Sequence, residues 1–171
     1  MRVNILLLQI PIYFLLGSLA TFFLEPYKVY PLIFCFSFAI FGICRANNLI
    51  EVFFLSFSFA FGWFCLGLYW IANAFLVKSG FYIFLIPIVA TLLPLFLSLI
   101  WSVAFITAKI ISSKIGEIHI NTIIILSIFE YLRGKLLKFP WLMPGHFFSS
   151  EEVLIQAFSF VGSYSMNLLF L

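Results

Sequence analysis

The chain has 171 residues, of which 65% are hydrophobic and 9% charged, and its net charge is +3. A soluble domain usually carries about 25% charged residues, so this composition excludes an ordinary soluble protein and predicts an integral membrane protein. A small positive charge in so apolar a chain gives no indication of nucleic-acid binding.

Six apolar runs follow one another along the chain, separated by short polar or proline-containing breaks. The first run exceeds the apolar core of a cleaved signal peptide, which is about 7–15 residues long, so we expect it to be retained as a span. The prediction is an all-α, polytopic helix bundle with six spans, at residues 5–24, 30–44, 51–77, 81–109, 120–132 and 153–171.

The third and fourth spans carry local features of their own. In the third, small residues and two tryptophans recur at helical spacing, which predicts a packing face; its members are Ser56, Ala60, Trp63, Gly67, Trp70 and Ala74. Asn73, a polar amide near the end of this span, is expected either to cap a helix contact or to face a cavity. In the fourth span, Pro87 and Pro94 predict a kink or a break.

The last span carries a stripe of polar residues. Gln156, Ser159, Ser163 and Asn167 fall within one narrow face of a continuous helix. Polar groups at membrane depth are costly and tend to face the bundle interior. We therefore expect this stripe to mark the inward face of the helix.

The segment from Phe129 to Gly145 differs most from the rest of the chain. It contains four of the fifteen charged residues together with a Pro-Trp step, a second proline and a glycine. Glu130 and Arg133 are three residues apart, so on a helix they can pair, and Arg133 can also extend its guanidinium to the headgroup level. We expect a helix that leaves the bilayer and a proline-broken interfacial segment between spans five and six.

Metal or thiol chemistry has little support in the sequence. Cys35, Cys44 and Cys65 lie in or beside apolar runs and have no CxxC spacing, so neither a metal site nor a disulfide framework is indicated. His119 is expected in a solvated loop rather than as a ligand. We expect no metal site and no cofactor.

Several short motifs, taken together, carry a family resemblance. They are LEPYKVYP at 24–31, GWFCLGLYWIAN at 62–73, the following GFYIF, FEYLRG at 129–134, FPW at 139–141 with Gly145, and VGSYSMN at 161–167. In this order and spacing the chain resembles the N-terminal membrane part of the apolipoprotein N-acyltransferase family. One departure is His146, where the family often has an aromatic residue.

The resemblance implies a function in lipoprotein maturation. Family members are bacterial inner-membrane enzymes that transfer an acyl chain from a phospholipid to the N-terminal diacylglyceryl-cysteine of a lipoprotein, using a Glu–Lys–Cys triad in a nitrilase-like domain. The partners implied are membrane phospholipid, the lipoprotein N-terminus and, where the domain is a separate chain, that chain. The candidate substrate-binding or lipid-binding residues are Glu130, Arg133, Lys135, Lys138, Pro140, Trp141, Gly145, Trp70 and Asn73.

No residue of this chain is assigned a catalytic role. The expectation is that residues 1–171 are a truncated N-terminal membrane domain without the nitrilase-like domain, which binds lipid substrate or acts as a scaffold and alone transfers no acyl groups. Two alternatives remain open. One is a non-enzymatic remnant, and the other is an unrelated small membrane scaffold or transporter.

Overall fold

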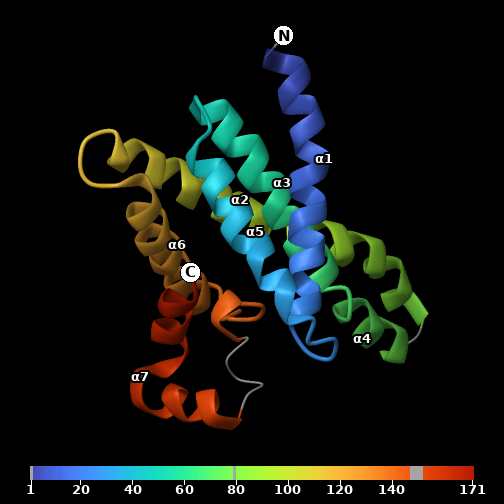
Figure 1. The fold of residues 1–171 in the computed structure, drawn as a ribbon. Coiled ribbons are helices and arrows are strands. Elements are labelled where there is room, and N and C mark those ends of the chain that lie inside the picture. The colour runs from blue at the N-terminus through green and yellow to red at the C-terminus, as the bar shows by residue number, and fades with distance from the viewer. Residues whose placement is uncertain (1, 79, 147–151) are drawn as a thin grey trace.

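The computed structural model describes residues 2–78, 80–146 and 152–171, and all regular structure within them is helical (Figure 1). The prediction of an all-α membrane bundle is therefore confirmed. The α-helices are α1 (Arg2–Ala20), α2 (Phe34–Cys44), α3 (Leu49–Gly67), α4 (Ile71–Lys78), α5 (Ile86–Ser112), α6 (Ile118–Leu136) and α7 (Glu152–Phe170), with shorter 3-10 turns η1 (Thr21–Phe23), η2 (Tyr30–Ile33) and η3 (Gly80–Leu85).

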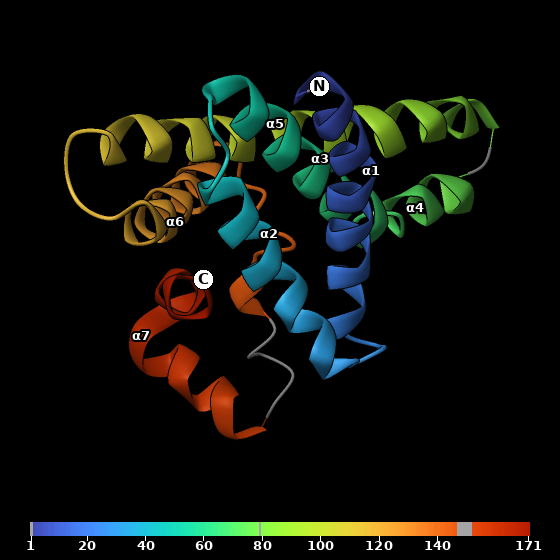
Figure 2. The same ribbon diagram turned by 45° about the horizontal axis from the view of Figure 1, so that its top comes forward.

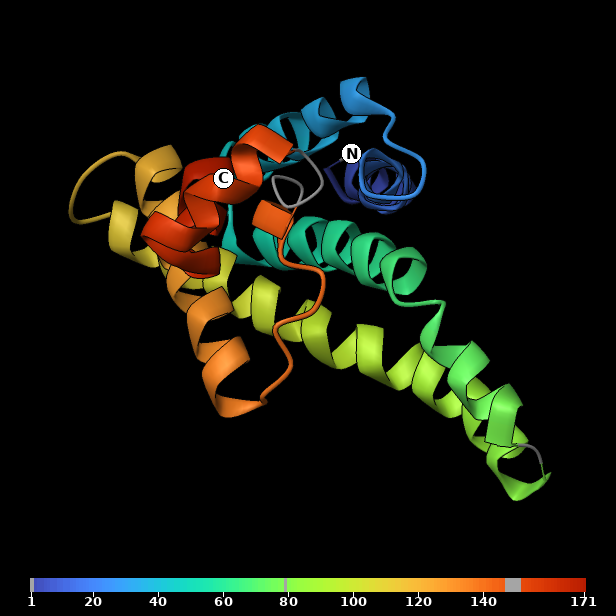
Figure 3. The same cartoon turned by 90° about the horizontal axis from the view of Figure 1, so that it is seen from below.

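Helix α3 lies at the centre of the bundle, between α1 and α5 (Figure 3). Glycines allow α1 and α3 to approach closely: a Cβ at Gly17 would stand 1.9 Å from the Phe59 carbonyl oxygen, and one at Gly62 would stand 2.1 Å from the Phe14 carbonyl oxygen. Small residues at such crossings let helix backbones pack without side chains between them. The two helices are also joined by a 2.6 Å hydrogen bond from Ser58 Oγ to the Ile10 carbonyl.

Buried aromatic rings fill the space between α2, α3 and α5. Phe36 contacts Trp63 edge-on at 4.8 Å between ring centroids, and Phe64 contacts Trp101 in the same way at 5.1 Å. Edge-to-face pairs of this kind each contribute about 0.5–1.5 kcal/mol beyond area burial. The abundance of phenylalanine therefore has a packing role in the core as well as on the lipid-facing surface.

Three helical stretches of the described residues are long and apolar enough to cross a membrane: Leu6–Phe23, Leu49–Val77 and Ile83–Ser112. A shorter apolar helical stretch, Tyr30–Cys44, corresponds to the expected second span. The total of six spans stays a prediction.

The third predicted span is not one continuous helix. Helix α3 ends at Gly67, and the chain turns through Leu68, whose φ and ψ are −109° and 6°, before α4 begins. Trp70 and Ala74 therefore do not share a helical face with Trp63, and that part of the predicted packing face is wrong. Glycine is a weak helix former, and here Leu142 of a distant loop packs against Gly67.

Of the kink or break expected at the prolines of the fourth span, a break is absent, because α5 runs without interruption from Ile86 to Ser112. Pro87 lies in the first turn of α5, where a missing N–H costs nothing, and α5 continues through the buried Pro94 to Ser112. Ser98 Oγ donates a 2.6 Å hydrogen bond to the Pro94 carbonyl. Ser79, in the connection before this helix, lies outside the described residues.

Helix α7 bends at Gly162, whose φ of 77° and ψ of 165° are not helical (Figure 2). Gln156 and Ser159, before the bend, are exposed, whereas Asn167, after it, is buried. The predicted inward-facing polar stripe is therefore wrong as a single face, because it assumed an unbroken helix. Only its last member reaches the interior.

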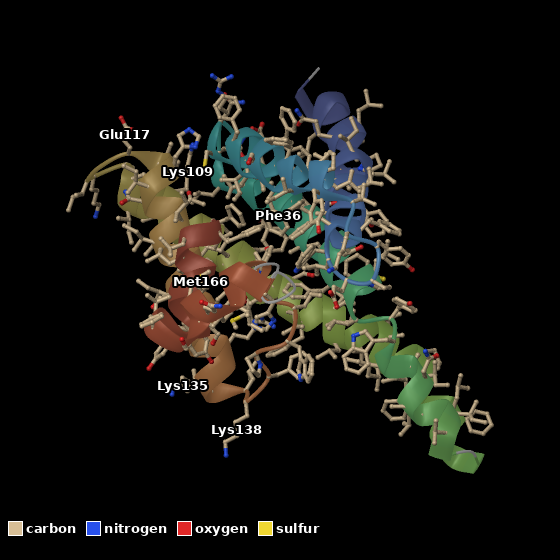
Figure 4. The ribbon with its side chains drawn as sticks, turned by 60° about the horizontal axis from the view of Figure 1, so that its bottom comes forward. Phe36, Lys109, Glu117, Lys135, Lys138 and Met166 are labelled. Carbon is tan, nitrogen blue, oxygen red and sulfur yellow. The ribbon has the colours of Figure 1, made fainter. Side chains whose placement is uncertain are left out.

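The two ends of the bundle carry different connections. Lys109 and Glu117 lie at the end where α5 leads into α6, and Lys135 and Lys138 lie at the opposite end (Figure 4). The turn after η1 also lies at the end of α1 that is far from the N-terminus (Figure 1). The end of the bundle with Lys135 and Lys138 holds the proline-broken segment.

Candidate functional site

Glu130 and Arg133 form a buried ion pair on α6, as their spacing predicts. Arg133 Nη2 donates to Glu130 Oε2 at 2.5 Å and Arg133 Nε donates to Glu130 Oε1 at 2.9 Å. Both side chains are completely buried. Two parallel hydrogen bonds between a guanidinium and a carboxylate give both energy and a fixed relative orientation.

The pair is bonded on both sides to other parts of the fold. Trp101 on α5 donates its indole N–H to Glu130 Oε1 at 2.7 Å. On the other side, Arg133 Nη1 donates to the Trp141 carbonyl at 2.9 Å, and the guanidinium lies 5.5 Å from the centroid of the Phe64 ring. The result is a hydrogen-bonded chain from α5 through α6 to the segment after α6.

The expectation that Arg133 extends its guanidinium to the headgroup level is wrong. Arg133 as a whole residue is only 2% exposed. A buried carboxylate and a backbone carbonyl supply the partners that water or lipid phosphate would otherwise provide, so the charge is satisfied inside the protein.

The segment after α6, residues 137–146, contains no helix of the α type, in agreement with the two prolines in it. Its backbone is held from three helices. Besides the bond from Arg133 on α6, Trp63 on α3 donates its indole N–H to the Leu142 carbonyl at 3.2 Å, and the Gly145 N–H donates to Asn167 Oδ1 on α7 at 2.9 Å. We call residues 137–146 the interfacial loop.

Glycines provide the close contacts of the interfacial loop with the helices. A Cβ at Gly145 would stand 2.4 Å from the Cα of Asn167, so the loop backbone lies directly on α7. A Cβ at Gly67 would stand 2.2 Å from a methyl carbon of Leu142. Glycine at these two positions leaves the space that the loop occupies.

A cavity of about 600 Å³ lies beside the interfacial loop. It is open to the outside, and Leu142 forms part of its wall. The other lining residues come from η1 and the turn after it, and from the end of α3 and the turn after it: Thr21, Phe22, Leu24, Glu25, Pro26, Tyr27, Leu66, Gly67, Tyr69 and Trp70. Tyrosine and tryptophan are enriched where a membrane meets water, so this composition suits an opening at that level.

Two exposed indoles stand at the edge of this cavity. Trp70 and Trp141 are 43% and 53% exposed, and their rings meet edge-on at 5.6 Å between centroids. Glu25, which also lines the cavity, forms an exposed ion pair with Lys28 at 3.0 Å. The cavity thus has apolar walls and an aromatic, charged rim.

The structure brings only part of the predicted site together. Trp141 and Gly145 lie in the interfacial loop, the Glu130–Arg133 pair on α6 is bonded to that loop, and Trp70 lines the cavity beside it. Three further predicted residues are exposed at or beside the interfacial loop but do not line the cavity: Lys135, Lys138 and Pro140. Asn73 is exposed on α4 and lies apart from the cavity lining.

Sequence reasoning missed Trp101 and Leu142. A buried indole N–H needs a hydrogen-bond partner, so Trp101 in the middle of an apolar span could have indicated an acceptor such as Glu130. Nothing local indicates that Leu142 lines a cavity. The thiols stay outside the site: Cys35 and Cys44 are buried, and Cys65 is partly buried on α3.

These observations define the chain as a helical membrane domain with an apolar cavity and a fixed loop at one end. The family description "Apolipoprotein N-acyltransferase N-terminal domain" matches residues 16–171. The chain belongs to the apolipoprotein N-acyltransferase family, and it carries the N-terminal domain of that family.

Individual relatives agree with this assignment. The chain is 31% identical to the apolipoprotein N-acyltransferase of Rhodopseudomonas palustris, over 91% of this chain and 30% of the relative. It is 28% identical to those of Rickettsia prowazekii, over 90% of this chain and 31% of the relative, and Sinorhizobium fredii, over 91% and 32%. The chain therefore spans about a third of the length of the curated relatives it matches.

Proposed function

We propose that this chain is the lipid-binding membrane part of an apolipoprotein N-acyltransferase that crosses the bacterial inner membrane several times. In this proposal the enzyme transfers an acyl chain from a phospholipid to the N-terminal diacylglyceryl-cysteine of a lipoprotein. Membership of the family and the three helical stretches long enough to span a membrane support the proposal.

The cavity beside the interfacial loop is the observation that carries the lipid-binding role. Its volume of about 600 Å³ falls within the range of about 300–1,000 Å³ that is typical of small-molecule pockets. Its apolar walls suit an acyl chain, and its aromatic rim suits the glycerol and headgroup region. We assign the acyl chain of the phospholipid to this cavity.

The exposed basic residues near the loop have a second role in the proposal. Lys135 and Lys138 lie at the end of α6 and in the loop that follows, where they attract lipid phosphate or acidic residues of a nitrilase-like domain. Pro140 and Gly145 shape the loop. Interfacial basic residues of this kind contribute about 1 kcal/mol each near an anionic surface.

The acyl-accepting thiol belongs to the nitrilase-like domain, whether that domain is part of the same protein or a separate chain. A reactive thiolate needs an electropositive, partly exposed setting. Cys35 and Cys44 are buried, with the Cys44 thiol 3.4 Å from the Thr122 hydroxyl, and Cys65 lies partly buried within α3. None of the three is assigned a catalytic role.

Photo-crosslinking tests the lipid-binding role. The chain is reconstituted in nanodiscs that contain a phospholipid with a diazirine in its acyl chain, irradiated, and digested for mass spectrometry. We expect crosslinks on cavity residues in excess of those on the exposed surface of α5. A Leu66→Trp variant, which fills the cavity, should lose the excess.

The matched control is Leu92→Trp, which places the same side chain on an exposed position of α5 and should retain the crosslinks. Crosslinking in the wild-type chain that is no stronger at the cavity than on α5 would overturn the proposal.

A further inference from the structure

We infer that Arg133 is the positioning residue of the lipid site: held by Glu130, it fixes the backbone of the interfacial loop and so sets the cavity wall that Leu142 forms. This inference rests on the proposed function, because it assigns a role within the same cavity. It replaces direct lipid binding, the role expected from the sequence, as the role of Arg133.

The Arg133 guanidinium has all its partners inside the protein. Arg133 donates to both oxygens of Glu130 and to the Trp141 carbonyl, and its exposed fraction is 2%. Its charge is compensated by a carboxylate that itself receives the Trp101 indole N–H. A group bonded in this way is not available to a lipid phosphate, but it is well suited to hold a loop.

The loop backbone adopts a conformation that needs outside support. Lys138 and Leu142 have φ values of 52° and 58°, in the left-handed region that costs an L-residue energy relative to the right-handed region. Such residues persist where the surrounding structure imposes them. The bonds donated by Arg133 and Trp63 to loop carbonyls, and the bond donated by the Gly145 N–H to Asn167, supply that constraint.

The loop is held by its backbone and not by its side chains. Arg133 and Trp63 donate to the backbone carbonyls of Trp141 and Leu142, and these bonds do not involve the side chains of the two loop residues. The two loop side chains are therefore left for other contacts. Trp141 meets Trp70 at the rim, and Leu142 packs over Gly67 and lines the cavity.

Through the loop backbone, Arg133 affects the position of a residue that lines the cavity. Loss of the bond to the Trp141 carbonyl frees the loop backbone one residue before Leu142 and leaves this part of the loop held only by the bond from Trp63 to the Leu142 carbonyl. The side chain of Leu142 is then less firmly fixed in the wall, and the fit of an acyl chain is weakened without any change in a residue that touches the lipid.

The test compares local and global effects of Arg133→Lys in nanodiscs. Lysine keeps the positive charge beside Glu130 but is a single point donor without the planar fork. We expect crosslinking at the cavity to fall roughly tenfold, the scale of one lost charge-assisted hydrogen bond. Hydrogen exchange should rise selectively at residues 137–146, while exchange in α1, α3 and α5 stays as in the wild type.

Trp63→Phe provides a second variant that does not touch the ion pair. It keeps an aromatic ring in the core but removes the donor to the Leu142 carbonyl, and should lower crosslinking roughly threefold, as expected for one neutral hydrogen bond. Arg45→Lys is the matched control, because Arg45 is exposed at the opposite end of the bundle and the substitution is the same.

Each outcome has a definite meaning. Absence of cavity crosslinking in the wild type overturns the proposed function itself. Wild-type crosslinking that is unchanged in Trp63→Phe and in folded Arg133→Lys overturns the positioning role alone. A fall that comes with increased exchange throughout the helices also overturns it, since the role would then be general stability; if Arg133→Lys does not fold, Trp63→Phe decides.

Discussion

The indole N–H of Trp101 on α5 donates a 2.7 Å hydrogen bond to the carboxylate of Glu130 on α6. Through this bond the carboxylate joins two helices, and through Arg133 it reaches the interfacial loop. An ion pair between neighbouring turns of one helix has thereby become a tertiary contact. Its members should behave as a unit when they are substituted.

The first prediction concerns this unit. Glu130→Gln keeps the shape of the side chain but leaves the Arg133 charge buried without compensation, which costs about 3–5 kcal/mol when a buried pair is broken. We expect the melting temperature in detergent to fall by about 10 °C or more. The control is Glu51→Gln, at the first turn of α3, where Asn47 donates to the carboxylate in an exposed setting; its effect should be much smaller.

A double variant extends this measurement. Glu130→Gln combined with Arg133→Gln removes both charges, so its melting temperature should lie above the value expected from adding the two single effects. Equal melting temperatures for Glu130→Gln and Glu51→Gln would reduce the pair to an ordinary surface interaction.

The second prediction concerns the contact between the interfacial loop and α7. A Cβ at Gly145 would meet the backbone of Asn167 and Met166, which cannot move aside cheaply. Gly145→Ala should therefore destabilise the fold by about 1–3 kcal/mol, the usual range for overpacking. Thermal unfolding and hydrogen exchange of α7 would measure it.

Gly134→Ala is the matched control for that substitution. Its Cβ would meet the end of the Tyr164 side chain, which can rotate away, and alanine favours the helix by up to about 1 kcal/mol. A loss of stability in Gly134→Ala as large as that in Gly145→Ala would contradict the assignment of the backbone contact.

The third prediction is a pH dependence that arises from His146. This residue lies after α6 and outside the candidate spans, and its pKa is lowered by burial and by the nearby charge of Arg133. Because the folded state holds the proton less tightly than the unfolded state, stability falls as pH drops below the ordinary histidine pKa of about 6.5. The fall ends once the pH passes below the folded pKa.

His146→Phe should flatten this dependence, because it removes the titrating group. The measurement is the difference in melting temperature between neutral and mildly acidic buffer, for the wild type and for the variant. An identical difference in both proteins would show that the acid sensitivity comes from other groups.

The fourth prediction concerns topology. Lys138 lies at the end of the bundle opposite to the α5–α6 connection (Figure 4), and we expect it on the outer side of the membrane with both termini inside. In a background with the three cysteines changed to serine, Lys138→Cys should react with an impermeant thiol reagent added from outside. Lys114→Cys should react only after the membrane is opened. The reverse pattern would require the opposite orientation.

Local sequence patterns were sufficient for several features. The length of the apolar runs identified a helical membrane domain, because a span must satisfy its backbone hydrogen bonds within itself. The spacing of Glu130 and Arg133 predicted their pairing, because residues three apart share a face of a helix. Pro140 and Pro144 predicted the irregular segment after α6, because proline interrupts the hydrogen bonding of a helix.

Other features depend on residues that are distant in the sequence. The Arg133 side chain is buried and does not extend toward the headgroups, because it bonds to the Trp141 carbonyl and to Glu130, which Trp101 on α5 holds in place. The end of α3 involves Leu142, which lies 75 positions beyond Gly67 and packs against it. The polar stripe of α7 failed at Gly162, because a glycine can adopt a positive φ that the periodicity of side chains does not reveal.

The sequence by itself thus determined the membrane class, the family and the charged pair of the candidate site, since each depends on composition, motifs or spacing along one helix. The tertiary structure alone decided that the pair is buried, that it holds the interfacial loop, and that a cavity lies beside that loop. The physical reason is that a buried charge and a cavity wall are set by the groups that surround them, and here those groups come from η1 and the turn after it, from α3, α5 and α6, and from the loop.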